Sequence, residues 1–132
     1  MKFTYNFWRP VTAIRNGDRD DNDATERDPS WTPLNATPMH PEYPSQAAII
    51  SGVAVGVLAS VFGPQPAIPC TATDVSAPNL QREYTSIAEM ADEHKNVRVW
   101  GGIHFRNSLE VGEEMGRKIA AYLIANALMP VR

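Results

Sequence analysis

Cysteine is almost absent from this chain of 132 residues, which contains Cys70 alone. A single cysteine excludes an internal disulfide framework and a zinc site built from several cysteines. An excess of basic residues is also lacking, because 12 lysines and arginines stand against 15 aspartates and glutamates. The net charge is −3, so a nucleic-acid-binding surface is not expected. Apolar residues still make up 43% of the sequence, a proportion that suits one small globular domain.

The N-terminus lacks the apolar core and the small-residue cleavage site of a secretory signal peptide. Its aromatic residues 2–8 are expected to form the last turns of a helix that stops before Pro10. The 11 prolines gather mainly in residues 31–44 and 63–80, which are expected to be extended connections. We expect a soluble protein, whose compartment and oligomeric state the sequence leaves open.

Residues 47–63 contain only apolar or small side chains, and Ser45 precedes them as a plausible N-cap. This pattern predicts a helix over about 46–62 that is apolar on every side. Such a helix is either a membrane span or the centre of a helical bundle. Its length lies at the lower limit for a span and no positive charge flanks it, so we favour the bundle. Gly52, Ala54, Gly56 and Ala59 would let neighbouring helices approach closely.

Two further helices are predicted towards the C-terminus. Ser86 and Glu89 form a capping box for a short helix over about 86–95. Gly101-Gly102 marks a break, and the last helix is expected to begin near Ser108 and to end at Pro130. Its apolar residues that share one face are Leu109, Met115, Ile119, Tyr122 and Leu123. No strand alternation stands out, so the sequence predicts an all-α helical bundle with long Pro-rich loops.

The acidic segment 16–30 resembles a calcium-binding loop only in part. Asp18, Asp20 and Asn22 stand in alternate positions. The sixth position holds Asp23 where a glycine must turn, and the twelfth holds Pro29 where a bidentate glutamate is needed. We therefore expect a solvated acidic loop.

Five residues in three clusters have the chemistry of an oxyanion receptor. Six residues separate Lys2 from Arg9, Ser45 caps the apolar helix, and Arg98 and His104 flank the glycine pair. Arginine supplies a planar fork of donors, and lysine supplies a point charge. A helix N-terminus adds free N–H groups and the positive end of a dipole. The histidine can bond the central atom of a bound oxyanion.

In this order the clusters resemble the motifs of the vanadium-dependent haloperoxidase and type 2 phosphatidic acid phosphatase superfamily, in its bacterial haloperoxidase-like branch. The first motif, lysine followed after six residues by Arg-Pro, is matched by Lys2 and Arg9. The second, Pro-Ser-Gly-His, reads Pro-Ser-Gln-Ala over residues 44–47. The third, Ser-Arg-x5-His-x3-Asp, reads Val-Arg-x5-His-x3-Ser over residues 97–108. The resemblance spans about residues 2–123.

The resemblance implies that His104 binds the vanadium of a vanadate cofactor, for which phosphate is a structural analogue. The residues implied to hold the oxyanion oxygens are Lys2, Arg9, Ser45, Arg98 and the backbone N–H of Gln46. A haloperoxidase of this kind uses hydrogen peroxide and a halide. In the related phosphatases the same pocket takes a phosphate ester, and the matching histidine becomes phosphorylated.

The departures from the motifs put activity in doubt. Ala47 occupies the position of the acid–base histidine, and Gln46 puts a side chain where the family has glycine. Ser108 replaces the aspartate that steadies His104, and it carries no charge. His40 is a possible substitute acid, and the alternative for it is a surface loop position. His94 follows Glu93 on the short helix and is expected at the surface. The rival readings are an oxyanion-binding module with impaired catalysis, a fragment completed by a partner chain, and a phosphatase.

Family members have several helices before the first motif, whereas Lys2 is the second residue here. We expect residues 1–132 to form a single haloperoxidase/acid phosphatase-like domain that is incomplete at its N-terminus. Upstream sequence, a partner chain or a second copy of this chain would supply the missing helices.

Overall fold

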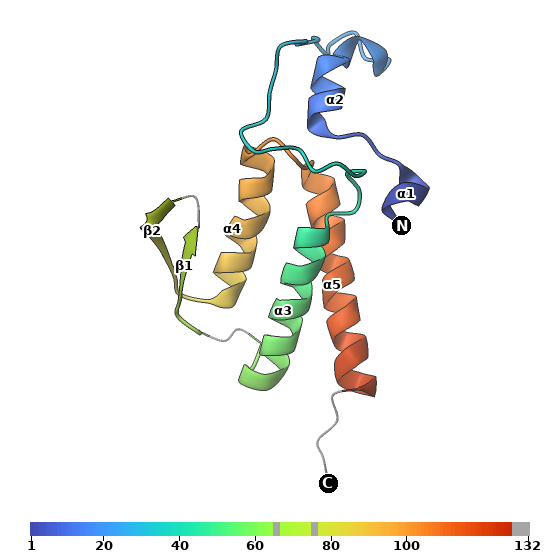
Figure 1. Cartoon of the computed structure of the whole chain (residues 1–132). Coiled ribbons are helices and arrows are strands. Elements are labelled where there is room, and N and C mark those ends of the chain that lie inside the picture. The colour runs from blue at the N-terminus through green and yellow to red at the C-terminus, as the bar shows by residue number, and fades with distance from the viewer. Residues whose placement is uncertain (65–66, 75–76, 128–132) are drawn as a thin grey trace.

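The computed structural model describes residues 1–64, 67–74 and 77–127. Its elements are α1 (Lys2–Tyr5), α2 (Pro10–Arg15), the 3-10 turn η1 (Gly17–Arg19), α3 (Gln46–Phe62), β1 (Cys70–Asp74), β2 (Ala77–Tyr84), α4 (Ile87–Trp100) and α5 (Arg106–Asn126). Figure 1 shows the three long helices side by side, with α1, α2 and the long connection at the end where α3 and α5 begin. The fold is mostly helical, as predicted.

Helix α3 has the predicted bounds. The Ser45 hydroxyl accepts a hydrogen bond from the N–H of Ala48 at 3.4 Å, and Gly63, with φ of 99°, ends the helix. Its apolar surface is covered only in part, because Ile50, Val61 and Phe62 are at least 60% exposed. Within the described ranges, no helix is both long enough and apolar enough to cross a membrane.

Helices α3 and α5 pack closely through glycines. A Cβ added at Gly116 would lie 2.2 Å from the Ile49 carbonyl oxygen, and one at Gly52 would lie 2.3 Å from the Glu113 carbonyl oxygen. Neither distance is physically possible without moving a backbone. The prediction that Gly52 and Gly56 permit close approach is confirmed, since a Cβ at Gly56 would be 2.6 Å from that of Ala120.

The buried face of α5 differs from the predicted one. The residues that it buries are Ser108, Leu109, Gly112, Gly116 and Ala120. Ile119 and Tyr122 of the predicted apolar face are 39% and 68% exposed. The small residues occupy the buried face because they allow α5 to approach the backbone of α3, which large side chains would prevent. The predicted end of this helix at Pro130 lies outside the described residues.

Helix α4 begins as predicted, since the Ser86 hydroxyl accepts from the N–H of Glu89 at 3.2 Å. The predicted end near residue 95 is wrong, because α4 continues to Trp100. The residues up to Trp100 keep helical geometry, and the chain turns only at Gly101 and Gly102. Lys95 pairs with Glu113 and so ties α4 to α5.

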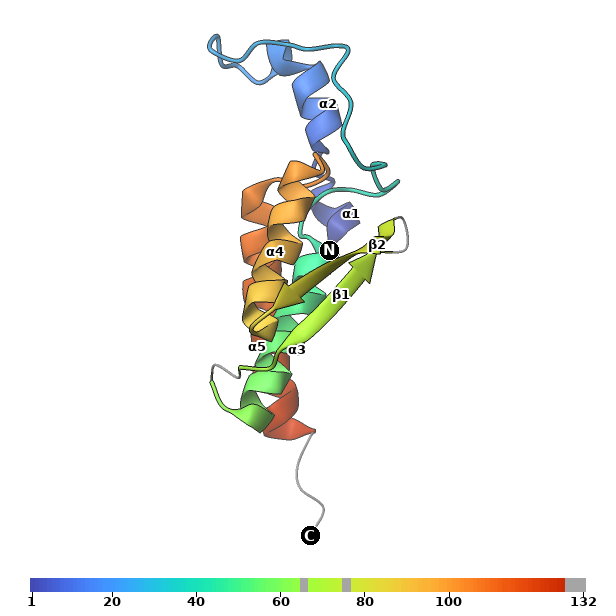
Figure 2. The ribbon, with the colours of Figure 1, turned by 90° about the vertical axis from the view of Figure 1, so that its left-hand side faces the viewer.

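The expectation of no strands is wrong, because β1 and β2 form an antiparallel hairpin with Cys70 opposite Tyr84. Figure 2 shows this hairpin lying across α3 and α4. β2 is exposed along most of its length, so it has no apolar alternation to detect. At the N-terminus the predicted helix over residues 2–8 already stops at Tyr5, because Asn6 adopts a left-handed conformation with φ of 46°.

Candidate functional site

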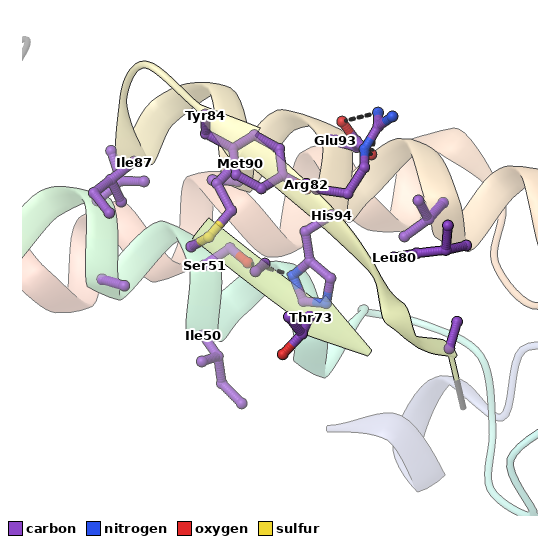
Figure 3. Close-up of a pocket in the computed structure, with 16 residues that line it drawn as sticks. Ile50, Ser51, Thr73, Leu80, Arg82, Tyr84, Ile87, Met90, Glu93 and His94 are labelled. Carbon is purple, nitrogen blue, oxygen red and sulfur yellow. Dashed lines mark hydrogen bonds and ion pairs between the residues drawn. The ribbon is translucent and has the colours of Figure 1, made fainter. Parts of the chain in front are cut away.

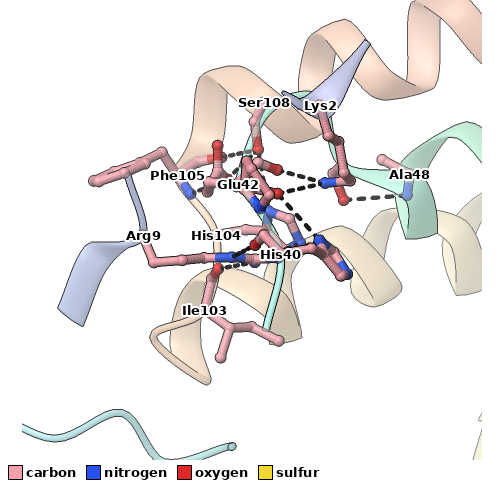
Figure 4. Close-up of polar contacts among 11 residues, drawn as sticks. Lys2, Arg9, His40, Glu42, Ala48, Ile103, His104, Phe105 and Ser108 are labelled. Carbon is pink, nitrogen blue, oxygen red and sulfur yellow. Dashed lines mark hydrogen bonds and ion pairs between the residues drawn. The ribbon is translucent and has the colours of Figure 1, made fainter. Parts of the chain in front are cut away.

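Lys2 and Arg9 meet the His104 loop at the end of the bundle where α3 and α5 begin and α4 ends, and Figure 4 shows these three side chains around Glu42. His104 lies in the loop between α4 and α5 and is 7% exposed. Lys2 comes from α1, Arg9 precedes α2, and Ser45 caps α3. The fold therefore unites residues that are up to about a hundred positions apart.

Glu42 is the buried partner of His104. Its side chain is 0% exposed, and its Oε1 lies 2.6 Å from His104 Nδ1. The same oxygen accepts from the Phe105 N–H at 3.1 Å and from the Ser108 hydroxyl. Glu42 is held in place by its own N–H, which donates to the Phe7 carbonyl at 2.9 Å. These contacts fix both the carboxylate and the imidazole ring.

The electrostatics assign the protons of this pair. Burial raises the pKa of Glu42, but the hydrogen bonds from His104, Ser108 and Phe105 outweigh burial and hold it below its ordinary value. Burial lowers the pKa of His104; the bond to Glu42 opposes this, whereas Arg9 adds to it. At neutral pH the imidazole is therefore neutral and donates its Nδ1–H to the ionised Glu42. The Nε2 atom keeps its lone pair.

Arg9 lies against that lone pair. Its Nη1 is 3.2 Å from His104 Nε2 and donates to the Ile103 carbonyl at 2.7 Å. Its Nε donates to the His40 carbonyl at 3.1 Å, and its Nη2 lies 3.2 Å from His40 Nδ1. His40 and His104 thus flank one buried guanidinium. Of the two positions considered for His40, the contact with Arg9 favours the one beside the site over a surface loop.

Lys2 adds a second cation beside the same loop. Its Nζ donates to the carbonyls of Pro41 and Glu42, at 3.1 and 2.8 Å, and one ammonium proton remains for a further acceptor. Burial lowers the pKa of Lys2, and the nearby charge of Arg9 lowers it further. The edge-on contact between the rings of Tyr5 and Tyr43, at 5.1 Å, holds α1 against this segment.

The start of α3 contributes backbone donors. Ser45 is fully buried, and its N–H donates to the Ser108 carbonyl at 3.1 Å. The next N–H groups, of Gln46 and Ala47, belong to the first turn and have no acceptor within the helix. The expectation that the Gln46 side chain enters the pocket is wrong, because that residue is exposed.

The side chain of Arg98 turns to an unexpected partner. Its Nη2 lies 2.9 Å from Nε2 of His94, and the Nδ1 of His94 lies 2.8 Å from the Ser51 hydroxyl oxygen. The expectation that His94 is a surface residue is wrong, since it is half-buried between α4 and α3. Its position one turn before Arg98 on the same helix was the available sequence signal.

Comparisons with known proteins agree with this geometry. Residues 1–131 match the sequence model of the VCPO second helical-bundle domain. This chain belongs to the vanadium haloperoxidase family. The crystal structure titled as the first bacterial vanadium-dependent iodoperoxidase is 32% identical, with a TM-score of 0.80 over 99% of this chain. No curated protein matches by sequence.

Two further haloperoxidase structures share the fold. The apo and holo forms titled as a bacterial vanadium-dependent chloroperoxidase have TM-scores of 0.70 and 0.65 at 21% and 22% identity. They cover 91% and 86% of this chain. The present haloperoxidase domain spans about 30% of the length of these solved chains.

This haloperoxidase domain replaces the motif aspartate at position 108 in an indirect way. Ser108 carries no charge, but its hydroxyl reaches Glu42, which places a carboxylate on His104 Nδ1. The loss of the motif aspartate therefore does not leave His104 without a charged partner. Sequence reasoning missed Glu42 because a lone glutamate between prolines has no periodicity; its position three residues before Ser45 was the one available signal.

The residues present fit a tetrahedral oxyanion. Two cations, Lys2 and Arg9, lie beside the histidine loop and its buried carboxylate. The Arg98 side chain contacts His94, and its Nε is buried without a partner in the described ranges. No group of three or more His, Cys, Asp or Glu side chains gathers as a metal site in that part of the chain. This donor set suits an anion held by charge and hydrogen bonds, with one histidine bond to its central atom.

Proposed function

We propose that this domain binds vanadate, or phosphate as its analogue, at His104 Nε2, and that it takes part in peroxide-dependent halide oxidation. The observation that carries the proposal is the neutral, buried His104, whose Nδ1–H is held by Glu42 and whose Nε2 lone pair faces Arg9. A metal-ligating imidazole commonly donates its other N–H to a carboxylate in this way.

In this proposal Lys2, Arg9, Arg98 and the N–H groups at the start of α3 neutralise the oxyanion charge. When bound, vanadate supplies the Lewis-acidic centre at which hydrogen peroxide oxidises a halide. Preorganised donors in a site with little water act more strongly than they would in solution. Without an anion, Arg9 uses four of the five N–H groups of its guanidinium. An anion bonded to His104 Nε2 would replace the contact between Arg9 and that atom, so two N–H groups of Arg9 would be free for the anion.

Proton transfer is the weak point of this site. Ala47 cannot move a proton, and general acid–base catalysis contributes about 10²–10⁴-fold. The Nδ1 of His40 lies 3.2 Å from Arg9 Nη2, and we propose that His40 supplies part of this transfer. We expect turnover to be slow, and His40→Asn to lower it further without weakening vanadate binding.

A second candidate is an oxyanion-binding domain that needs the rest of a longer protein or a partner chain. The exposed apolar side chains of α3 support it, since Ile50, Val61 and Phe62 would be covered by further helices. Phosphate ester hydrolysis needs a proton donor for the leaving group, so the alanine at position 47 disfavours it.

Orthovanadate titration of the wild-type protein and of His104→Ala tests the proposal. We expect saturable binding by the wild type and at least tenfold weaker binding by the variant, with the exposed Tyr122→Ala as the control. Equal and weak binding by all three proteins would contradict the proposal. Halide oxidation by the double variant Gln46→Gly, Ala47→His then separates the two candidates. A gain in turnover would identify an enzyme that lacks only its acid–base histidine, whereas no gain would favour the binding domain.

A further inference from the structure

Arg98 is attached to a chain of hydrogen bonds that the family motifs do not contain. Its Nη2 meets His94 Nε2 at 2.9 Å, and His94 Nδ1 meets Ser51 Oγ at 2.8 Å. Ser51 belongs to α3 and is 9% exposed. Figure 3 shows Ser51 and His94 facing each other at a cavity of about 630 Å³, which is lined mainly by apolar side chains of α3, α4 and the hairpin.

The direction of each hydrogen bond in this chain follows from the residue types. Arginine has no acceptor, so His94 Nε2 must accept from Arg98. The ring proton therefore lies on Nδ1 and is donated to the Ser51 oxygen. Burial lowers the pKa of His94, and the charge of Arg98 lowers it further, in agreement with a neutral ring. The Ser51 oxygen accepts this proton and so stabilises the tautomer that Arg98 requires.

Arg98 has a further N–H group that these hydrogen bonds do not use. Its Nε is buried and has no hydrogen-bond partner in the part of the chain that the structure describes. The Arg98 carbonyl accepts from the N–H groups of Ile103 and His104, at 3.2 and 3.3 Å, so the main chain ties Arg98 to the histidine loop. The unpaired Nε is therefore a free donor that could meet an anion.

We propose that His94 is a positioning residue, which holds the Arg98 guanidinium for the oxyanion through one hydrogen bond that only the neutral ring can accept. The proposal rests on the proposed function, because it needs an anion at His104. Protonation of His94 removes the acceptor at Nε2 and places a second positive charge beside Arg98. Anion affinity then decreases at acid pH for a reason separate from His104.

Two other charged side chains, Arg82 and Glu93, line the same cavity. Arg82 of β2 and Glu93 of α4 pair with each other at 2.7 Å, so their charges largely cancel near His94. Tyr84 of β2 also lines the cavity. The lining residues from α3 and the described lining residues from β1 carry no charge, which leaves Arg98 as the charge that His94 senses.

The test compares orthovanadate affinity of the wild type, His94→Leu and His94→Gln at pH 8 and pH 5.5. Leucine fits the apolar cavity but accepts no hydrogen bond, so we expect binding at pH 8 to weaken about tenfold, the equivalent of about 1.4 kcal/mol. Glutamine keeps an acceptor and does not titrate. We expect it to bind within about threefold of the wild type at pH 8 and to lose less affinity at pH 5.5.

Urea midpoints of the three proteins show whether each is folded, and Ser51→Ala should weaken binding less than His94→Leu. Wild-type affinity in His94→Leu, or equal losses in the leucine and glutamine variants, would overturn the role of His94 while leaving the proposed function standing. Failure of the wild type itself to bind orthovanadate would overturn both.

Discussion

The buried pair of Glu42 and His104 makes a quantitative prediction for the variant Glu42→Gln. The change keeps the shape of the side chain and removes its charge. Hydrogen bonds to a charged group contribute about 1.5–3 kcal/mol each, against about 0.5–1.5 kcal/mol for neutral ones. Glu42 Oε1 accepts three donors, from His104, Phe105 and Ser108. The difference is about 1 kcal/mol or more for each of the three bonds, so we expect the variant to lose about 3 kcal/mol of unfolding free energy at neutral pH.

Ser108 offers a rescue of that variant. Its hydroxyl oxygen lies 3.3 Å from His104 Nδ1, so an aspartate at this position would bring a carboxylate within reach of the ring. We expect Glu42→Gln combined with Ser108→Asp to recover part of the lost stability. Ser108→Asp alone should be destabilising, because it buries a second carboxylate beside Glu42. The sign of the Ser108→Asp effect should therefore depend on residue 42.

Urea unfolding followed by circular dichroism measures these differences. A loss of about 3 kcal/mol lowers the midpoint by about 1.5 M when the slope is about 2 kcal/mol per molar urea. The matched control is the exposed glutamate of α5 in Glu110→Gln, which should change stability by less than about 0.5 kcal/mol. If Glu42→Gln were as stable as this control, the carboxylate would not be the structural anchor of His104.

Three further predictions concern acid, packing and charge. The free energy of unfolding should be highest above a pH of about 6.5 and should fall as the pH decreases. Burial lowers the pKa of His104 and His94 in the folded protein, so the unfolded chain binds more protons in this range. Urea midpoints from pH 8 to 5 measure this dependence. Gly116→Val should cost about 3 kcal/mol or more, since its Cβ would meet the Ile49 carbonyl oxygen, whereas the exposed Ala121→Val should be nearly neutral in the same assay. Lys2→Met should weaken orthovanadate binding about tenfold in a titration, and an unchanged affinity would remove Lys2 from the site.

Local signals predicted the parts of the fold that local chemistry controls. The bounds of α3 follow from the Ser45 cap and from Gly63, and the start of α4 follows from Ser86. The meeting of Lys2, Arg9 and His104 was predicted from motif order alone, because no local pattern relates residues so far apart. The mostly helical fold was predicted both from local signals and from the motif order.

The features that were missed depend on tertiary contacts. Glu42 became a candidate only when the chain placed its carboxylate on His104 Nδ1. The buried face of α5 is decided by how closely Gly112 and Gly116 approach α3, which a count of apolar residues cannot reveal. His94 was expected on the surface because it follows Glu93, whereas the helix turns it towards Ser51.

The central claim is that His104 Nε2 binds the central atom of an oxyanion while Glu42 holds Nδ1–H. The most direct measurement is the ¹⁵N NMR spectrum of the imidazole rings during titration with orthovanadate at pH 8. We predict that the His104 Nε2 resonance shifts and reaches a plateau as orthovanadate saturates the site, while Nδ1 keeps its proton. A His104 Nε2 resonance that stays unchanged while orthovanadate binds, or a proton found on Nε2 in the free protein, would contradict the account.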